Sequence, residues 1–316
     1  MQAYIAQRIL LMVPALIGVT LIVFIAARLA PVDTVNVILG DTGIKDEAIK
    51  NEIRSRLGLD QSIPQQYLSW FGGMVQGDFG KSWYTGESIR TELSHRLPVS
   101  FELGTLSLIL SISLAIPLGT IAALKQDSWI DNMTRGVAVL LLSIPSFWLG
   151  LIIVGLGYYF WAWAPPAEYK SFAESPSEHI RVMMWPVLVL GLTLAGTEIR
   201  LVRSSLLEVL RQDYIRTARA KGLREMTVLT GHALKNAMIP VVTVIGLQLP
   251  IVVAGSVVLE NIFMVPGIGR YVVQASTQYD FPIMQSVVVM VATVIMVSNL
   301  AVDVSYGWLD PRIRFR

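Results

Sequence analysis

Apolar runs long enough to cross a lipid bilayer recur along this chain and set its predicted architecture. A hydrocarbon core about 30 Å thick needs roughly 20 predominantly apolar residues per helix. Six windows meet or nearly meet that length: Ile9–Ala30, Val99–Leu124, Gly136–Phe160, Trp185–Arg203, Ala237–Leu259 and Ile283–Val302. The pattern predicts an all-α polytopic membrane protein with six transmembrane helices.

The fourth window is the weakest of the six. Its clean apolar run, Trp185–Thr197, stops before Glu198 and Arg200, and at 1.5 Å per residue it covers only about 20 Å. We therefore expect this helix to lie inside the bundle, with its charged end among protein groups or in water rather than in lipid.

Two long polar stretches separate the windows. Within residues 31–97, Asp46–Leu57 alternates charges at helical spacing and ends at Gly58, a residue suited to a helix C-cap. Pro64–Met74 carries aromatic and apolar side chains that fit a helix on the membrane surface or one packed on the ends of the spans, and we expect the packed arrangement. Trp161–Met184 is rich in Pro, Ser and Glu and is expected to be irregular.

Composition agrees with this architecture and narrows the chemistry. Of 316 residues, 53% are hydrophobic and 15% charged, and mean hydropathy is +0.58, which excludes a soluble globular chain. Cysteine is absent, so disulfides and thiolate chemistry are excluded. The first apolar stretch follows Arg8 and is too long for the apolar part of a secretory signal, so we expect a retained anchor.

The distribution of Lys and Arg predicts the orientation. With a cytoplasmic N-terminus, six spans return the C-terminus to the cytoplasm, and 14 of the 25 basic residues fall on that side. Basic residues near span ends favour the cytoplasmic side, whereas the opposite orientation would leave the cluster at 200–235 outside. The 14 are Arg8, Lys125, Arg135, Arg200, Arg203, Arg211, Arg216, Arg219, Lys221, Arg224, Lys235, Arg312, Arg314 and Arg316.

Patterns that could carry catalytic or metal chemistry do not meet their requirements. Gly80-Lys81-Ser82 is similar to the end of a phosphate-binding loop, but that loop needs a glycine five residues earlier, where Val75 stands. The three histidines lie far apart in the sequence, so no metal site is expected. No Ser-His-Asp arrangement or nucleophile elbow is visible. The sequence therefore predicts neither an enzyme nor a resident cofactor.

Ionisable residues near the centre of a span would indicate an ion-coupled carrier. Glu102, Glu198, Glu260 and Asp303 fall near the ends of their windows, and the windows otherwise offer Ser, Thr, Gly, Pro, Asn and Gln. This predicts a pathway lined by neutral groups, with energy supplied from elsewhere. A secondary carrier and a membrane scaffold or receptor subunit remain alternatives, and ordinary helix packing explains most of the neutral residues individually.

The polar segment Gln212–Gly222, reading QDYIRTARAKG, lies between the fourth and fifth windows. Asp213 can cap a helix there, Tyr214–Lys221 gives two turns, and Gly222 can adopt the left-handed conformation that ends it. Four residues share one face by i, i+3 and i+4 spacing, namely Tyr214, Thr217, Ala218 and Lys221. The face is predicted to enter a groove on a soluble partner. A helix held on anionic lipid headgroups is the alternative, and no nucleic-acid contact is expected.

The same segment resembles a known signature. DYIRTARAKG followed by HALKNAMIPVVTVIGLQLP is similar to the cytoplasmic loop of ATP-binding-cassette (ABC) importer permeases, particularly those of the dipeptide, oligopeptide and nickel branch. The general signature is Glu-Ala-Ala, three residues, Gly, nine residues, then Ile-x-Leu-Pro. Aligned on Gly222, only Ala218 of the opening triplet and Leu234 of the closing motif match, and such departures are typical of the peptide branch.

The resemblance covers nearly the whole chain. Leu11–Pro31 is similar to the first span of that branch and Leu57–Ser82 to its outer segment. Four further motifs continue it: RLPVSFELG (Arg96–Gly104), LSIPSFWLG (Leu142–Gly150), ENIFMVPGIG (Glu260–Gly269) and LDPRIR (Leu309–Arg314).

The resemblance implies the type I ABC importer permease fold in a prokaryotic cell membrane, either an inner or a plasma membrane. Residues 1–97 would hold the first span and an extracytoplasmic segment, and residues 98–316 a core of five spans with a coupling helix near 213–222. The implied partners are a second homologous permease, two cytoplasmic ATPase subunits that bind ATP and magnesium, and an extracytoplasmic binding protein. Di- or oligopeptides are the expected substrate, with nickel complexes, glutathione and glycosides as alternatives.

The loop helix would then be the coupling helix, seated in a cleft of one ATPase. The resemblance implies the contacts Tyr214, Arg216, Thr217, Ala218 and Lys221, with Gly222 at the helix end. Replacing Ala218 or Gly222 by Asp is expected to leave folding largely intact and to uncouple transport from ATP hydrolysis.

Overall fold

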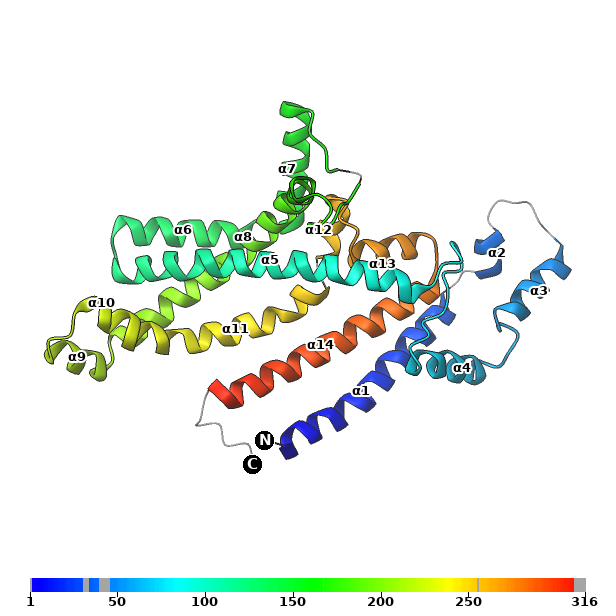
Figure 1. Ribbon diagram of the computed structural model, residues 1–316, viewed down its shortest axis with the longest axis horizontal. Coiled ribbons are helices and arrows are strands. Elements are labelled where there is room, and N and C mark those ends of the chain that lie inside the picture. The colour runs from blue at the N-terminus through cyan, green and yellow to red at the C-terminus, as the bar shows by residue number, and fades with distance from the viewer. Residues whose placement is uncertain (1, 31–33, 40–45, 167, 255, 310–316) are drawn as a thin grey trace.

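The computed structural model describes residues 2–30, 34–39, 46–166, 168–254 and 256–309. In these ranges all regular elements are helical, apart from an isolated bridge between Lys81 and Ser88. Long helices form an elongated bundle, with α9 and α10 at one end (Figure 1). The elements are α1 (Gln2–Leu29), α2 (Thr34–Leu39), α3 (Glu47–Arg56), α4 (Ile63–Val75), α5 (Ile89–Leu124), α6 (Trp129–Ser143), α7 (Ser146–Trp161), α8 (Pro176–Leu210), α9 (Asp213–Ala220), α10 (Glu225–Thr227), the π-helical segment η1 (Val228–Leu234), α11 (Lys235–Ala254), α12 (Val257–Ile262), α13 (Ile268–Thr277) and α14 (Phe281–Leu309).

The helices confirm the predicted all-α polytopic fold. Among the described residues, five helices are long and apolar enough to cross a membrane, or six if the bent pair of α6 and α7 counts as one span. The five segments correspond to the first, second, fourth, fifth and sixth predicted windows, and they are Ile5–Leu29, Ile89–Leu124, Pro176–Leu210, Glu225–Val252 and Phe281–Val302.

The third predicted span, Gly136–Phe160, is not one straight helix. α6 ends at Ser143, α7 begins at Ser146, and the two helices meet at 90°. A residue that precedes proline is disfavoured in the helical conformation, and Ile144, before Pro145, is extended at φ −90° and ψ 118°. A hydropathy window sums across this break, so it shows a single apolar run where the backbone turns.

Two other boundaries differ from those predicted. The fifth window runs to Leu259, but α11 ends at Ala254, and a new helix, α12, begins after Ser256, which caps it by accepting from the amide of Leu259. The polar stretch Trp161–Met184 is shorter than expected, because α8 already begins at Pro176. At the C-terminal end, the features that lie outside the described residues are the side chain of Asp303, the motif Leu309–Arg314 beyond its first residue, and Arg312, Arg314 and Arg316.

The pair of α5 and α8 forms the centre of the bundle (Figure 1). Glycines let the two backbones approach each other closely. A Cβ at Gly191 of α8 would stand 2.9 Å from the carbonyl oxygen of Ser107 of α5, and one at Gly119 of α5 would stand 2.9 Å from that of Ile199 of α8. The spacing of the pair therefore depends on the absence of side chains at these two positions.

The polar segment between α1 and α5 packs on the first helix. The rings of Tyr67 and Trp70 in α4 lie 5.4 and 5.7 Å from that of Phe24 in α1. The hydroxyl of Tyr67 also lies 2.9 Å from that of Thr20. The packed arrangement expected for Pro64–Met74 is confirmed.

Candidate functional site

The polar loop between α8 and α11 contains a short helix, as predicted. α9 spans Asp213–Ala220, and Gly222 follows it at φ +80°, in the left-handed region that glycine adopts without steric cost. The predicted cap is wrong, because Gln212 occupies that position without a side-chain hydrogen bond. Asp213 is instead the first helical residue, and its carboxylate pairs with Arg216 at 3.1 Å.

One face of α9 is buried against the rest of the chain. Ile215 is fully buried and Ala218 is only 7% exposed. Both belong to an apolar cluster with Leu206 of α8 and with Val228 and Ala233 of η1. A helix of eight residues is not stable alone in water, so this contact holds α9 in place.

The opposite face of α9 is open to solvent. Tyr214 is 42% exposed, and Thr217 and Lys221 are exposed as well. The predicted four-residue face is therefore divided, because Ala218 points into the chain with Ile215, three residues before it. Spacing alone shows which residues share a face, whereas the larger apolar side chain decides which face turns inward.

Basic and apolar side chains alternate on the exposed side of this loop. Arg216 and Arg224 are exposed, and Leu223 and Met226 are 40% and 68% exposed. Exposed apolar side chains rimmed by charges mark a surface that suits contact with another protein. We call this surface the loop face, and it consists of Tyr214, Arg216, Thr217, Lys221, Leu223, Arg224 and Met226.

Two contacts orient the loop face, and helical spacing predicts neither of them. Arg219 donates two hydrogen bonds, of 3.1 and 2.5 Å, to the carboxylate of Glu225 in α10, and these raise the pKa of its guanidinium. Asn236 of α11 donates to the hydroxyl of Tyr214 at 3.0 Å. Both contacts join the two sides of the turn at Gly222. The sequence signal for the contact between Arg219 and Glu225 is an acidic residue six positions after an arginine, with the glycine of the turn, Gly222, between them.

The segment Gly80-Lys81-Ser82 leads into a structural turn at residues 83–85. The hydroxyl of Ser82 donates to Asp280 at 2.5 Å, and the amide of Tyr84 donates to the same carboxylate at 3.3 Å. Asp280 immediately precedes α14, so this contact fastens the segment before α5 to the start of α14.

The histidines lie in separate places. His179 of α8 is 3% exposed, and its Nε2 lies 2.8 Å from a carboxylate oxygen of Glu102 in α5. His95 lies in α5 and His232 in η1. In the part of the chain that the structure describes, no three His, Asp or Glu residues are grouped as metal ligands would be.

Two carboxylates lie deeper in the protein than the sequence predicts. Glu198 is fully buried and accepts a hydrogen bond from the hydroxyl of Ser111 in α5. Its apolar window ends soon after Glu198, whereas α8 continues to Leu210, so Glu198 lies inside the helix. Its burial among protein groups agrees with the position expected for the charged end of this window. Glu260 is also fully buried, which raises its pKa, and it accepts from Ser100 at 2.8 Å.

Two family models cover almost all of the chain. The "Binding-protein-dependent transport system inner membrane component" matches residues 115–315, and the N-terminal region of such a membrane component matches residues 1–104.

Relatives of full length are found in several bacteria. The dipeptide transport system permease protein DppB of Escherichia coli (strain K12) is 37% identical over 339 aligned residues, covering 100% of both chains. The di/tripeptide transport system permease protein DppB of Pseudomonas aeruginosa (strain UCBPP-PA14) is 37% identical, covering 99% of both. A putative peptide transport system permease protein of Brucella abortus (strain 2308) is 37% identical, covering 100% of both.

A solved structure shares the fold. A chain in the structure of inward-facing conformations of the MetNI methionine ABC transporter superposes with a TM-score of 0.55 at 16% identity, covering 69% of this chain and 96% of that one. The family matches and the full-length relatives agree with this architecture. The chain therefore belongs to the binding-protein-dependent transport system inner membrane component family: it is a multi-pass inner membrane permease of an ABC importer, a family without cofactors or catalytic activity of its own, in which ATP is hydrolysed on a separate subunit.

Proposed function

We propose that this chain forms half of the translocation pathway of an ATP-driven importer of di- or oligopeptides. The observation that supports this substrate is the full-length similarity, at 37% identity, to permeases named for dipeptide, di/tripeptide and peptide transport. Nickel complexes, glutathione and glycosides are the alternatives, because specificity in such a system resides largely in the binding protein.

The proposed assembly holds a second homologous permease, two ATPase subunits and an extracytoplasmic binding protein. The loop face is proposed to sit in a cleft of one ATPase, through Tyr214, Arg216, Thr217 and Lys221. Its support is an exposed basic and apolar surface on a helix whose other face is fixed to the bundle. Ala218 leaves the proposed contact set because it is buried, while Gly222 still sets the end of the helix.

Coupling would then be mechanical. ATP closes the ATPase dimer, the two coupling helices approach each other, and the bundle changes from an inward-facing to an outward-facing state. α9 follows α8 after two residues and packs on η1, which leads into α11, so a displacement of α9 acts on two spans.

The proposed orientation places both termini and the loop face in the cytoplasm. Figure 1 shows α9 and the start of α1 toward the same end of the bundle. The high density of Lys and Arg in residues 200–235 supports a cytoplasmic position for that end. The division into residues 1–97 and 98–316 stays a prediction, and α5 runs across it from Ile89 to Leu124.

Uptake into proteoliposomes tests the proposed function. The reconstituted complex, supplied with binding protein and a radiolabelled dipeptide, is expected to accumulate the peptide only when ATP is present inside the vesicles. Uptake that persists without ATP would favour a secondary carrier. Retention of binding without any uptake would favour a scaffold or receptor.

Charge reversal on the loop face tests the coupling contact. Lys221→Glu changes an exposed side chain and is expected to leave folding intact while lowering uptake more than ATP hydrolysis. Gly222→Asp strains the turn at φ +80° by about 1 kcal/mol and is expected to act in the same direction. Ala218→Asp is not a clean test, contrary to the expectation from sequence, because it would bury a carboxylate in an apolar cluster. Normal uptake by Lys221→Glu would contradict the assignment.

A further inference from the structure

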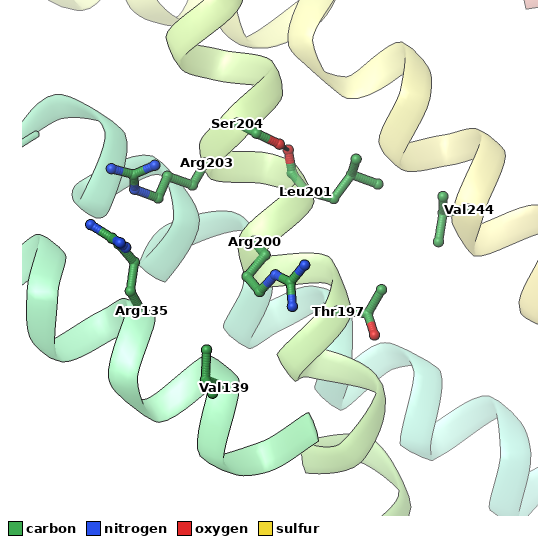
Figure 2. Close-up of a pocket in the computed structure, with 8 residues that line it drawn as sticks. All are labelled: Arg135, Val139, Thr197, Arg200, Leu201, Arg203, Ser204 and Val244. Carbon is green, nitrogen blue, oxygen red and sulfur yellow. Dashed lines mark hydrogen bonds between the residues drawn. The ribbon is translucent and has the colours of Figure 1, made fainter. Parts of the chain in front are cut away.

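A hollow opens between α6, α8 and α11, in the part of α8 that leads toward α9 (Figure 2). Its volume is about 490 Å³; apolar atoms form most of its surface, while five of the eight residues that line it carry a basic or hydroxyl group. The polar lining residues are Arg135, Thr197, Arg200, Arg203 and Ser204.

Three of these residues form one stripe of α8. Thr197, Arg200 and Ser204 follow one another at spacings of three and four, which places them on the same face of the helix. All three are exposed, and Figure 2 shows the side chain of Arg200 extending toward Thr197. The stripe therefore presents a guanidinium with a hydroxyl one turn before it and another one turn after it.

The charges of the hollow are not balanced within the chain. Arg203 donates two hydrogen bonds of 2.6 Å to Asp131, whose side chain is fully buried. The charge of Arg203 is therefore neutralised. Among the described residues, neither Arg135 nor Arg200 has a hydrogen bond or ion pair, although the charge of Asp131 also acts on Arg135. Arg200 thus remains available for an anion from outside the chain, with Arg135 as a second, partly compensated cation.

The position of Arg200 restricts what can cover this face. Arg200 lies within a helix that is apolar enough to cross a membrane, and an exposed arginine there must face water, headgroups or protein rather than hydrocarbon. α8 and α11 are also the two spans that the α9 loop joins. A displacement of that loop would change the width of the hollow, as expected for a passage that opens and closes with ATP.

We propose that this hollow is a carboxylate-binding subsite of the translocation pathway, in which Arg200, flanked by Thr197 and Ser204 and assisted by Arg135, binds the carboxylate of a substrate on its way to the cytoplasm. A guanidinium can bind a carboxylate through two parallel N–H···O bonds. The inference rests on the proposed function and narrows its chemistry to substrates with a free carboxylate, such as the C-terminus of a peptide. It replaces the expectation of a pathway lined only by neutral groups.

Exposure of the two arginines sets the expected strength of binding. A solvated cation attracts an anion weakly, because water screens the charge. Weak binding suits a site on a transport pathway, because the substrate must be released from the site in order to move on. The subsite is therefore expected to bind in the millimolar range, well below the affinity expected of a delivering binding protein.

The absence of cysteine from this chain allows a direct test. Ser204→Cys places one thiol in the hollow. The whole complex, without nucleotide, is placed in lipid nanodiscs, and the labelling of this chain is measured from its intact mass. A negatively charged methanethiosulfonate is expected to react roughly tenfold faster than a positively charged one, because clefts of one charge concentrate the opposite ion. Adding Arg200→Gln is expected to remove most of this preference. Lys125→Cys, exposed at the end of α5 and outside the hollow, is the control and should show little preference.

Competition identifies the ligand. A dipeptide at millimolar concentration is expected to slow the labelling of Ser204→Cys, and its C-terminal amide is not. The proposal is overturned if the thiol does not react, if the two reagents react equally, or if acid and amide protect equally. Slower labelling on adding anionic lipid, with no effect of the peptide, would assign the hollow to a headgroup phosphate and also overturn it. If the wild-type complex shows ATP-dependent peptide uptake while these results fail, only the subsite is refuted.

Discussion

Truncation of Ile215 is the most direct test of how the loop face is held. Ile215 is fully buried in the cluster beneath α9, and Ala218 contributes only one methyl group beside it. Ile215→Ala removes three carbons from that contact without changing any exposed residue. We expect the variant to insert and fold, with α9 detaching from the bundle far more often than in the wild type.

The expected magnitude follows from the contacts around α9. Truncating a buried isoleucine to alanine costs about 2–5 kcal/mol. The surface pair of Arg219 and Glu225 contributes little, because water screens its charges. The bond from Asn236 to Tyr214 is also exposed and contributes about 1 kcal/mol or less. Packing therefore dominates, and its loss would raise the detached population by a factor of about 30 or more, since each 1.4 kcal/mol is a tenfold change.

Hydrogen exchange and transport measure the two consequences. Amides of residues 212–222 are expected to exchange about 30-fold faster or more in Ile215→Ala, and uptake is expected to fall further than ATP hydrolysis. Ile215→Val is the matched control, with a cost of about 0.5–1.5 kcal/mol and a correspondingly smaller change. Unchanged protection of residues 212–222 in a folded Ile215→Ala complex would refute the reasoning that burial of this side chain holds the loop.

Two further predictions concern the bundle. A Cβ at Gly104 of α5 would overlap the backbone of Val252 in α11, so Gly104→Ala should lower the thermal midpoint in detergent by the equivalent of about 1–3 kcal/mol. Gly136 has open space around it, so the control variant Gly136→Ala should not lower the midpoint. Equal midpoints for the two variants would contradict this prediction. Asp131→Ala leaves Arg203 without its carboxylate partner and should lower the free energy of unfolding, measured with a chemical denaturant, by on the order of 3 kcal/mol. Adding Arg203→Met should recover much of that stability. If the double variant recovers none, the unpaired arginine is not the cause of the loss.

The sequence is sufficient to predict the parts of the fold that hydropathy and local backbone chemistry determine. Apolar runs locate five of the six spans, since a helix that crosses lipid must carry them whatever it packs against. Gly222 identifies the end of α9 because few residues other than glycine adopt φ +80° without strain.

The remaining features depend on contacts between distant residues. Pro145 is compatible with a kinked helix or with a 90° break, and only packing decides between them. Glu198 resembles the end of a span because a charge interrupts the apolar run, but Ser111, 87 residues earlier, provides a partner inside the bundle. The inward face of α9 is likewise decided by the apolar cluster with Val228 and Ala233, which local spacing does not contain.

The π-helical segment η1 relates the length of the chain to the direction of the loop face. Each residue of an α-helix advances it by 1.5 Å and rotates it by about 100°, and a π-helical turn accommodates one residue more than a regular turn. Deleting one residue between Val228 and Leu234 would allow a regular helix to form, with η1 and α11 joined in a single register. The α9 loop would then rotate by about 100° about that axis, and the loop face would point in a different direction. The number of residues in η1, more than their identity, therefore sets the direction of the loop face, the surface proposed to contact an ATPase.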